Sequence, residues 1–268
     1  MARVWLRWAG SKWRSLNNLR PVFERYSYDL FVDPFVGAGS VFFHLNKAPH
    51  AILSDTNSDL IHFYSHLRCN PNRLLEEFNS LPNIVSRRTY YRTREEFNRA
   101  GPSYRRSTQF FFLNRLCFNG VYRVNQFGKF NVPMGSRSTF RMPSIESLTQ
   151  TSTMLRAAKL RPSDFGSTRR YARRGSLFYI DPPYTASTQG HAFDRYSWPP
   201  FREPELLKLG HYLDAIAKRG ASVVVSYAGQ GRPSFVPSYF HLKTFTVYRS
   251  ISVNGSRSHY SEICAYYP

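Results

Sequence analysis

Apolar runs and helical patterns alternate in the first third of the chain. Residues 29–34, with three consecutive apolar residues at 30–32, have the pattern of a short buried strand. The segment Phe35-Val-Gly-Ala-Gly39 follows as a glycine turn, and the apolar residues 41–45 favour a helix. The pattern predicts a strand, a glycine turn and a helix in succession.

A second unit of the same kind comes next. The apolar run 51–53 ends just before Asp55, and Asn57 or Ser58 can cap a helix whose apolar positions lie within 60–67. Because strand and helix alternate, we expect a parallel sheet with helices packed on it.

Two further buried strands are predicted much later in the chain. Residues 176–180 and 222–227 are short apolar runs, and the segment 204–219 between them has a helical pattern. The tail, residues 240–267, alternates as antiparallel strands do. These elements indicate the α/β fold class.

The composition changes in the middle of the chain, where arginine and tyrosine crowd together and strand signals become rare. Two helical patterns stand out there, at 74–81 and 108–118. We therefore expect an inserted, mostly helical domain over residues 66–170, with residues 1–65 and 171–268 forming the domain that holds the sheet.

The charge balance indicates a polyanionic partner. The 268 residues include 37 Lys and Arg against 17 Asp and Glu, a net charge of +20 that exceeds what solubility requires. Nucleic acid is the first candidate, and an anionic membrane surface is the second. Thirty of the cations are arginine, which suits bidentate phosphate and guanine contacts, although a GC-rich genome gives the same bias.

The cysteines and the hydropathy further restrict the class of protein to which the chain can belong. Cys69, Cys117 and Cys264 lack the spacing of a disulfide framework or a zinc site, so we expect a reduced compartment and no metal. No apolar run approaches the eighteen or so residues of a membrane-spanning helix. We expect a cytoplasmic protein without secretion or membrane insertion.

The glycine turn and Asp55 form one candidate ligand site. Gly37 and Gly39 let the backbone approach a ligand at a helix N-terminus, and an acid at the end of the next strand can bind ribose hydroxyls. The pattern is neither G-x-G-x-x-G nor a Walker loop, which favours a nucleoside over a dinucleotide or a nucleoside triphosphate. Taken alone, it is equally typical of a tight connection between strand and helix.

The segment Asp181-Pro-Pro-Tyr184 is the most informative motif. Its prolines hold a stiff loop beyond the carboxyl end of the strand 176–180, where open α/β sheets bind ligands. The Asp181 carboxylate and the Pro182 carbonyl can both accept hydrogen bonds from one exocyclic amino group, while Tyr184 stacks on the ring that bears it. This combination predicts chemistry on an aromatic amine.

Six segments in this order are together highly specific: residues 7–12, 31–42, 55–61, 118–135, 181–184 and 250–255. Through them the sequence resembles the Dam-type DNA adenine-N6 methyltransferases. The resemblance implies a Rossmann-like methyltransferase sheet with an inserted target-recognition domain that carries a β-hairpin. It also implies S-adenosylmethionine as cofactor, site-specific methylation of a flipped-out adenine in double-stranded DNA, and a DNA-associated protein of a bacterial or viral host cell.

The resemblance assigns residues to the reaction. It implies cofactor contacts by Trp8, Lys12, Asp33, Phe35, Gly37, Gly39, Asp55 and Asp181. It implies catalytic roles for Asp181, Pro182 and Tyr184, without a metal. By accepting both amino hydrogens, Asp181 and Pro182 would favour a pyramidal nitrogen that is poised for in-line displacement.

The resemblance also assigns DNA contacts, most of them to a hairpin at 118–135: Arg7, Phe118, Asn119, Val121, Arg123, Asn125 and Pro133. Phe118 would wedge beside bases, and Asn119 would help to hold the opened site. An arginine on a hairpin in the major groove can grip O6 and N7 of guanine, so Arg123 is expected to read guanine. GATC is the first sequence to test, because family members commonly recognise it.

Alternatives remain. Cytosine-N4 methylation would use the same loop chemistry, although those enzymes more often have serine where Asp181 stands. A catalytically silent DNA-binding relative would keep the scaffold, but the intact 181–184 loop argues against it. RNA is a further possible substrate. The arginines between residues 169 and 174 have no clear counterpart in the family, and we expect them to contact phosphates.

Overall fold

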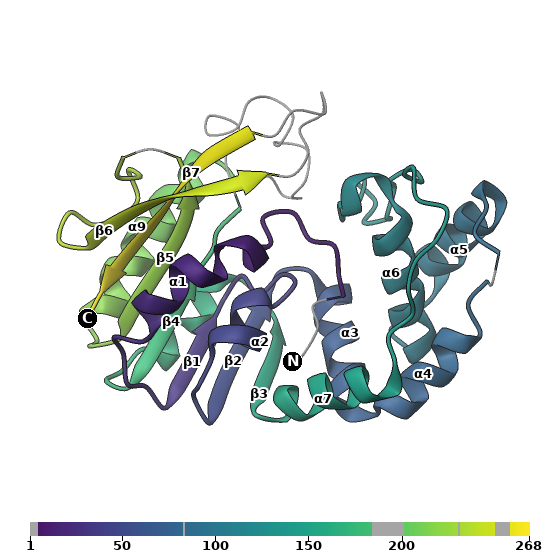
Figure 1. The fold of residues 1–268 in the computed structure, drawn as a ribbon, viewed down its shortest axis with the longest axis horizontal. Coiled ribbons are helices and arrows are strands. Elements are labelled where there is room, and N and C mark those ends of the chain that lie inside the picture. The colour runs from purple at the N-terminus through teal and green to yellow at the C-terminus, as the bar shows by residue number, and fades with distance from the viewer. Residues whose placement is uncertain (1–4, 83, 184–200, 230, 250–257) are drawn as a thin grey trace.

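The computed structural model describes residues 5–82, 84–183, 201–229, 231–249 and 258–268 (Figure 1). Its centre is a seven-stranded sheet in the order β3-β2-β1-β4-β5-β7-β6. The strands are β1 (Leu30–Asp33), β2 (His50–Asp55), β3 (Ala158–Pro162), β4 (Ser176–Ile180), β5 (Ser222–Ala228), β6 (His241–Arg249) and β7 (Ser258–Tyr267). The first five are parallel, and β7 runs antiparallel between β5 and β6.

Helices lie on both faces of the sheet and beyond its β3 edge (Figure 1). The α-helices are α1 (Leu16–Phe23), α2 (Ser40–Leu45), α3 (Ser58–Cys69), α4 (Pro71–Asn79), α5 (Arg87–Arg99), α6 (Tyr104–Leu116), α7 (Ile145–Arg156) and α9 (Glu203–Ala217). Short 3-10 helices are η1 (Lys12–Ser15), η2 (Phe118–Gly120) and η3 (Phe165–Tyr171). The mixed α/β fold matches the expected Rossmann-like sheet.

The strands form because both faces of the sheet are apolar. In β4, Leu177 and Tyr179 pack into the cluster that holds α1, α2 and α3, whereas Phe178 and Ile180 pack into the cluster that holds α9. All five β4 residues are buried. A strand buried on both faces is a continuous apolar run, which is why the sequence pattern finds it.

The helices α4, α5 and α6 gather on the side of α3 away from the sheet (Figure 1). Phe63 of α3 stacks on Phe111 of α6 with ring centroids 6.1 Å apart, and Phe78 of α4 meets Phe111 at 4.9 Å. These rings belong to the same apolar cluster as the sheet residues on that face. The role of this region as an inserted recognition domain remains a prediction.

The order of the strands reverses between β1 and β4, which are parallel neighbours although far apart in sequence. The loop after β1 leads into α2 and the loop after β4 begins at Asp181, so both leave from the same edge of the sheet. Open α/β sheets bind ligands at such a switch point. The topology therefore brings the two motifs of the sequence together.

Most of the predicted strands and helices are confirmed, but one strand and three α-helices were not predicted. Residues 158–162, inside the range 66–170 expected for the insertion, form β3 and pair with β2 at the sheet edge. Most of β3 is not buried, so it lacks an apolar run. The helices α1, α5 and α7 also went unpredicted, because α1 contains Pro21, α5 is rich in arginine and α7 in Ser and Thr.

The expected hairpin at 118–135 is present in reduced form. Its pairing consists of the isolated bridges Cys117–Met134 and Val124–Phe130, with a bond from the Asn131 N–H to the Arg123 carbonyl. A turn closes it, since the Gly128 N–H donates to the Asn125 carbonyl at 2.9 Å.

Among the helices that the structure describes, none combines the length and the apolar character needed to cross a bilayer.

Candidate active site

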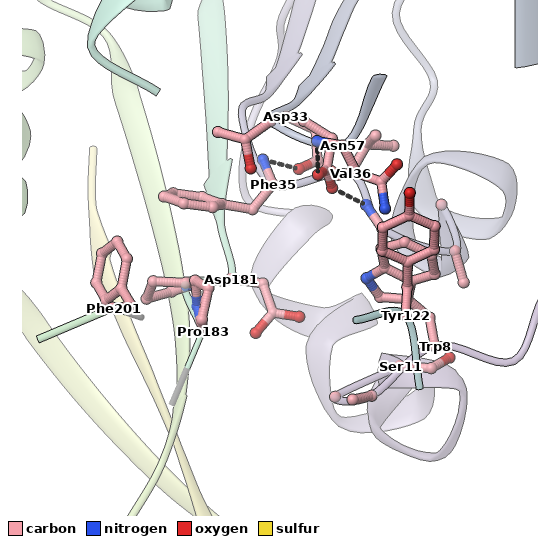
Figure 2. A pocket seen from close by; sticks show the side chains of 18 of the residues that line it. Trp8, Ser11, Asp33, Phe35, Val36, Asn57, Tyr122, Asp181, Pro183 and Phe201 are labelled. Atoms are coloured by element: carbon pink, nitrogen blue, oxygen red, sulfur yellow. Dashed lines mark hydrogen bonds between the residues drawn. The ribbon is translucent and has the colours of Figure 1, made fainter. Parts of the chain in front are cut away.

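A cavity of about 520 Å³ opens at the carboxyl ends of β1, β2 and β4 (Figure 2). Its walls come from the N-terminal segment, from the loops after these three strands and after β3, and from the hairpin region. All eight residues expected to contact the cofactor line the cavity: Trp8, Lys12, Asp33, Phe35, Gly37, Gly39, Asp55 and Asp181. Pro182 also lines the cavity, whereas Tyr184 lies outside the described residues.

Two carboxylates shape the glycine turn, that of Asp33, which is buried, and that of Asp55, which is partly buried. Oδ1 of Asp33 accepts from the Phe35 N–H at 3.1 Å, and Oδ2 of Asp55 accepts from the Gly37 N–H at 3.1 Å (Figure 2). The other Asp55 oxygen accepts from the Asn57 N–H at 2.9 Å. Burial raises the pKa of Asp55 to about 6 and the pKa of Asp33 well above its usual value. Asp55 therefore orders the turn. Its contact with a ribose stays a prediction.

Trp8 lies against the glycine turn. An added Cβ at Gly37, where φ is +47°, would come within 2.7 Å of the indole ring. The same indole stacks on Tyr122 of the hairpin region, with ring centroids 6.4 Å apart and planes at 22° (Figure 2). The N-terminal segment therefore joins the turn to the hairpin across the cavity.

Gly37→Ala is expected to lower the free energy of unfolding by about 1–2 kcal/mol and to weaken binding of the cofactor that the resemblance implies, because the substitution strains φ and displaces Trp8. Urea unfolding and calorimetric titration with that cofactor measure the two effects. Gly101→Ala is the matched control, since a Cβ there meets nothing within 4 Å. Equal stability and cofactor affinity in both variants would contradict the close packing.

Asp181 stands at the end of β4 with its carboxylate facing the cavity (Figure 2). Its Oδ1 accepts from Nζ of Lys12 at 2.5 Å, and Nζ also donates to the Gly10 carbonyl at 3.1 Å. Burial raises the pKa of Asp181 to about 6, although the Lys12 cation opposes the shift. The structure thus gives Lys12, expected at the cofactor, a direct contact with the expected catalytic carboxylate.

Behind Lys12 lies a second carboxylate. Glu262 of β7 is fully buried, and its Oε1 is 3.4 Å from Nζ of Lys12. Tyr179 of β4, also buried, lines the cavity, and its hydroxyl has no hydrogen-bond partner among the described residues. A buried hydroxyl without a partner fits a cavity that takes a polar ligand.

A buried ion pair joins the cavity to the helices beyond α3. Asp59 accepts two hydrogen bonds from Arg106 of α6, at 2.7 and 3.1 Å, and one from the Tyr122 hydroxyl at 2.6 Å. Arg106 also donates to the Ala100 carbonyl at 2.6 Å. All three side chains of this network, Asp59, Arg106 and Tyr122, line the cavity.

The residues expected to contact DNA divide into three groups. Phe118, Asn119 and Pro133 are exposed, and Phe118 retains 52% of its surface. Val121 is buried and lines the cavity, as does Arg123.

The other two residues expected to contact DNA, Asn125 and Arg7, form hydrogen bonds that stabilise the local backbone. The Asn125 side chain accepts from the N–H groups of Phe127 and Lys129, at 3.0 Å each, and so orders the turn. The Arg7 guanidinium donates to the Cys117 carbonyl at 3.3 Å, while its backbone pairs with the Asn114 side chain.

Comparison with known proteins assigns the family. Residues 8–255 match the D12 class N6 adenine-specific DNA methyltransferases. The chain belongs to this family. It is 30% identical over 268 residues to the DNA adenine methylase of Escherichia coli K12, covering 99% of this chain and 95% of that protein.

Two other relatives agree. The DNA adenine methylase of Haemophilus influenzae is 31% identical, over 95% of this chain and 90% of its own. The Type II methyltransferase M.MjaIII of Methanocaldococcus jannaschii is 32% identical, over 84% of this chain and 83% of its own. This member of the D12 class is therefore an enzyme that transfers a methyl group to N6 of adenine in DNA, and it requires a methyl donor.

Sequence reasoning about this methyltransferase missed several residues that line or support the cavity: Asp59, Arg106, Tyr122, Asp164, Phe165, Tyr179 and Glu262. Phe165 stacks on Phe35 with ring centroids 5.5 Å apart, and Phe35 lies across the cavity from Trp8 (Figure 2). Glu262 offered a signal, because it is the one acid in the apolar alternation of the tail. An acid at a buried strand position indicates a buried partner.

Proposed function

We propose that this methyltransferase uses S-adenosylmethionine, acts on double-stranded DNA at a specific sequence, and holds the target adenine by Asp181 and Pro182. The supporting observation is that the Asp181 loop and the glycine turn line one cavity, from opposite sides of the β1–β4 switch point. The donor fits the chemistry of the walls, which offer aromatic faces, carboxylates and the Tyr179 hydroxyl, which has no hydrogen-bond partner in the described part of the chain. When bound, S-adenosylmethionine supplies an electrophilic methyl group on a sulfonium sulfur.

The chain must make an aromatic amine into a nucleophile. The lone pair of adenine N6 is delocalised into the ring, so a catalyst has to localise it. The Asp181 carboxylate accepts one amino hydrogen, and the Pro182 carbonyl accepts the other, which favours a pyramidal nitrogen. As N6 gains the methyl group it loses one proton, and Asp181 is placed to accept it.

We assign extrusion of the target adenine to the hairpin region. A stacked, paired adenine cannot reach the cavity, and flipping it out costs a few kcal/mol. Phe118 is exposed beside Asn119, whose φ of +52° is the one positive value among non-glycine residues that the structure describes. We assign Phe118 to wedge between bases and Asn119 to hold the opened site, while Tyr184 stacks on the extruded adenine.

The pH dependence of kcat/KM should show an acid limb near pH 6. Only the ionised Asp181 accepts both the hydrogen bond and the proton, and its pKa of about 6 lies above the ordinary Asp value, so activity is present above pH 6 and is lost as the pH falls through it. Steady-state kinetics between pH 5 and 8 check this. A rate that stays constant down to pH 5 would remove Asp181 from the role of acceptor.

Arg123→Ala should relax discrimination at one guanine of the recognition site, by about 1–3 kcal/mol. Nε of Arg123 donates to Oδ1 of Asn131 at 2.9 Å across the hairpin, which fixes the guanidinium for bidentate contact. Rates on duplexes with single-base changes measure the loss position by position. A uniform loss on every sequence would identify a phosphate contact instead.

The DNA sequence that the enzyme recognises is proposed to be GATC. The test is a panel of duplexes that carry GATC, each single-base variant of it, the matching single strand and the matching RNA, all incubated with labelled S-adenosylmethionine. Preferred labelling of the GATC duplex supports the proposal. Equal labelling of a variant site rejects GATC, and preferred labelling of RNA or of the single strand rejects duplex DNA as the substrate.

A further inference from the structure

Glu262 is a buried charge that the mechanism above leaves unused. Its Oε1 accepts from the Ser226 hydroxyl at 2.6 Å, and its Oε2 accepts from the Ser15 hydroxyl. The third polar contact of Glu262 is with Lys12, whose Nζ is 3.4 Å from Oε1. Two hydroxyl donors and one cation thus surround this buried carboxyl group.

Lys12 lies between two carboxylates. Its Nζ is 2.5 Å from Asp181 on the cavity side and 3.4 Å from Glu262 on the inner side, and the exposed fractions of the three side chains are 2%, 18% and 0%. With Lys12 protonated and both acids ionised, the trio carries a net charge of −1. If Glu262 were neutral, Lys12 and Asp181 would cancel.

We propose that Glu262 is a positioning residue for methyl transfer, which shares Lys12 with Asp181 and so leaves a net negative charge at the wall of the cavity. This inference rests on the proposed role of Asp181. During the transfer, positive charge passes from the donor sulfur to adenine N6. A fixed negative charge beside that path stabilises the transition state more than a neutral ion pair would.

The titratable groups that face Asp181 determine whether its pKa should rise or fall when the charge of Glu262 is removed. They are Lys12 of η1, Glu262 of β7, Asp33 of β1 and Tyr179 of β4. Burial raises the pKa values of Asp33 and Tyr179 above their usual ranges. The Glu262 charge raises the pKa of Asp181 and Lys12 lowers it, so loss of the Glu262 charge should lower that pKa.

The first experiment follows the Asp181 carboxyl by ¹³C NMR in the free protein, with the resonance assigned by its loss in Asp181→Asn. Glu262→Gln keeps the shape but removes the charge, and the pKa of Asp181 should fall by about half a unit, as expected for charges several ångströms apart. Ser226→Ala is the matched control, because it removes a hydrogen bond to Glu262 and leaves the charge. An unchanged pKa in Glu262→Gln, or an equal shift in Ser226→Ala, would overturn the inference.

The second experiment measures kinetics on the GATC duplex. Glu262→Gln should move the acid limb of kcat/KM to lower pH and lower kcat on the order of tenfold, with KM for DNA unchanged. A lower kcat with an unmoved acid limb would indicate a merely structural role. A wild-type protein that forms no N6-methyladenine would reject the proposed function, while the NMR comparison would still decide whether Glu262 acts on Asp181.

Folding of Glu262→Gln is checked by thermal melting. If that variant does not fold, the comparison is made between Lys12→Met and Lys12→Met/Glu262→Gln, since the double variant buries no charge at either position. The pKa of Asp181 should be lower in the double variant than in Lys12→Met. Equal values would overturn the inference.

Discussion

Asp181→Ala is expected to lower kcat by at least about 10²–10³-fold, while the affinity for the DNA duplex stays close to that of wild type. In the proposed mechanism the carboxylate accepts a hydrogen bond from the reacting amino group, whereas the positive charge of the chain and the hairpin hold the duplex. Losing the acceptor therefore affects the transition state much more than it affects binding.

Single-turnover kinetics and a fluorescence binding titration separate the two effects. Asp214→Ala is a matched control, because Asp214 forms an exposed ion pair with Lys218 on α9, remote from the cavity lining. Wild-type kcat in Asp181→Ala would contradict the acceptor role. A parallel loss of DNA affinity would show that Asp181 acts through binding.

Asp59→Asn is expected to cost about 3 kcal/mol of the free energy of unfolding. Its side chain is 8% exposed and that of Arg106 is 19% exposed, and removing one partner of a buried pair leaves the other charge without compensation. The same carboxylate accepts from Tyr122, which stacks on Trp8, so a loss of donor affinity should accompany the loss of stability.

Urea unfolding monitored by circular dichroism measures the change. Glu95→Gln is the control, because the Glu95–Arg99 pair has 65% and 79% of its side-chain surface exposed and should contribute little. If Asp59→Asn is as stable as Glu95→Gln, the pair does not hold α6 against α3.

The parts of the fold that were predictable are those in which local pattern and burial coincide. The strands β4 and β5 are continuous apolar runs because both faces of the sheet are covered, and α3 begins at an Asn57 cap that accepts from the Leu60 N–H. The edge strand β3 could not be found in this way, because most of its residues face solvent and its pairing with β2 is non-local.

The candidate site was predictable for a similar reason and with a similar limit. Motifs such as the glycine turn and the Asp181 loop are local, and the parallel sheet brings them to one edge. The contact of Lys12 with Glu262 joins residues 250 positions apart, and the pair Asp59–Arg106 joins two helices. Such partners depend on tertiary packing, which no local pattern encodes.

The most direct measurement is the nucleoside composition of the product. The protein is incubated with a GATC duplex and S-adenosylmethionine that carries a deuterated methyl group, and the digested DNA is analysed by mass spectrometry. The account predicts deuterated N6-methyldeoxyadenosine as the one labelled nucleoside. Label on deoxycytidine, or the absence of labelled nucleoside while calorimetry shows the donor bound, would contradict it.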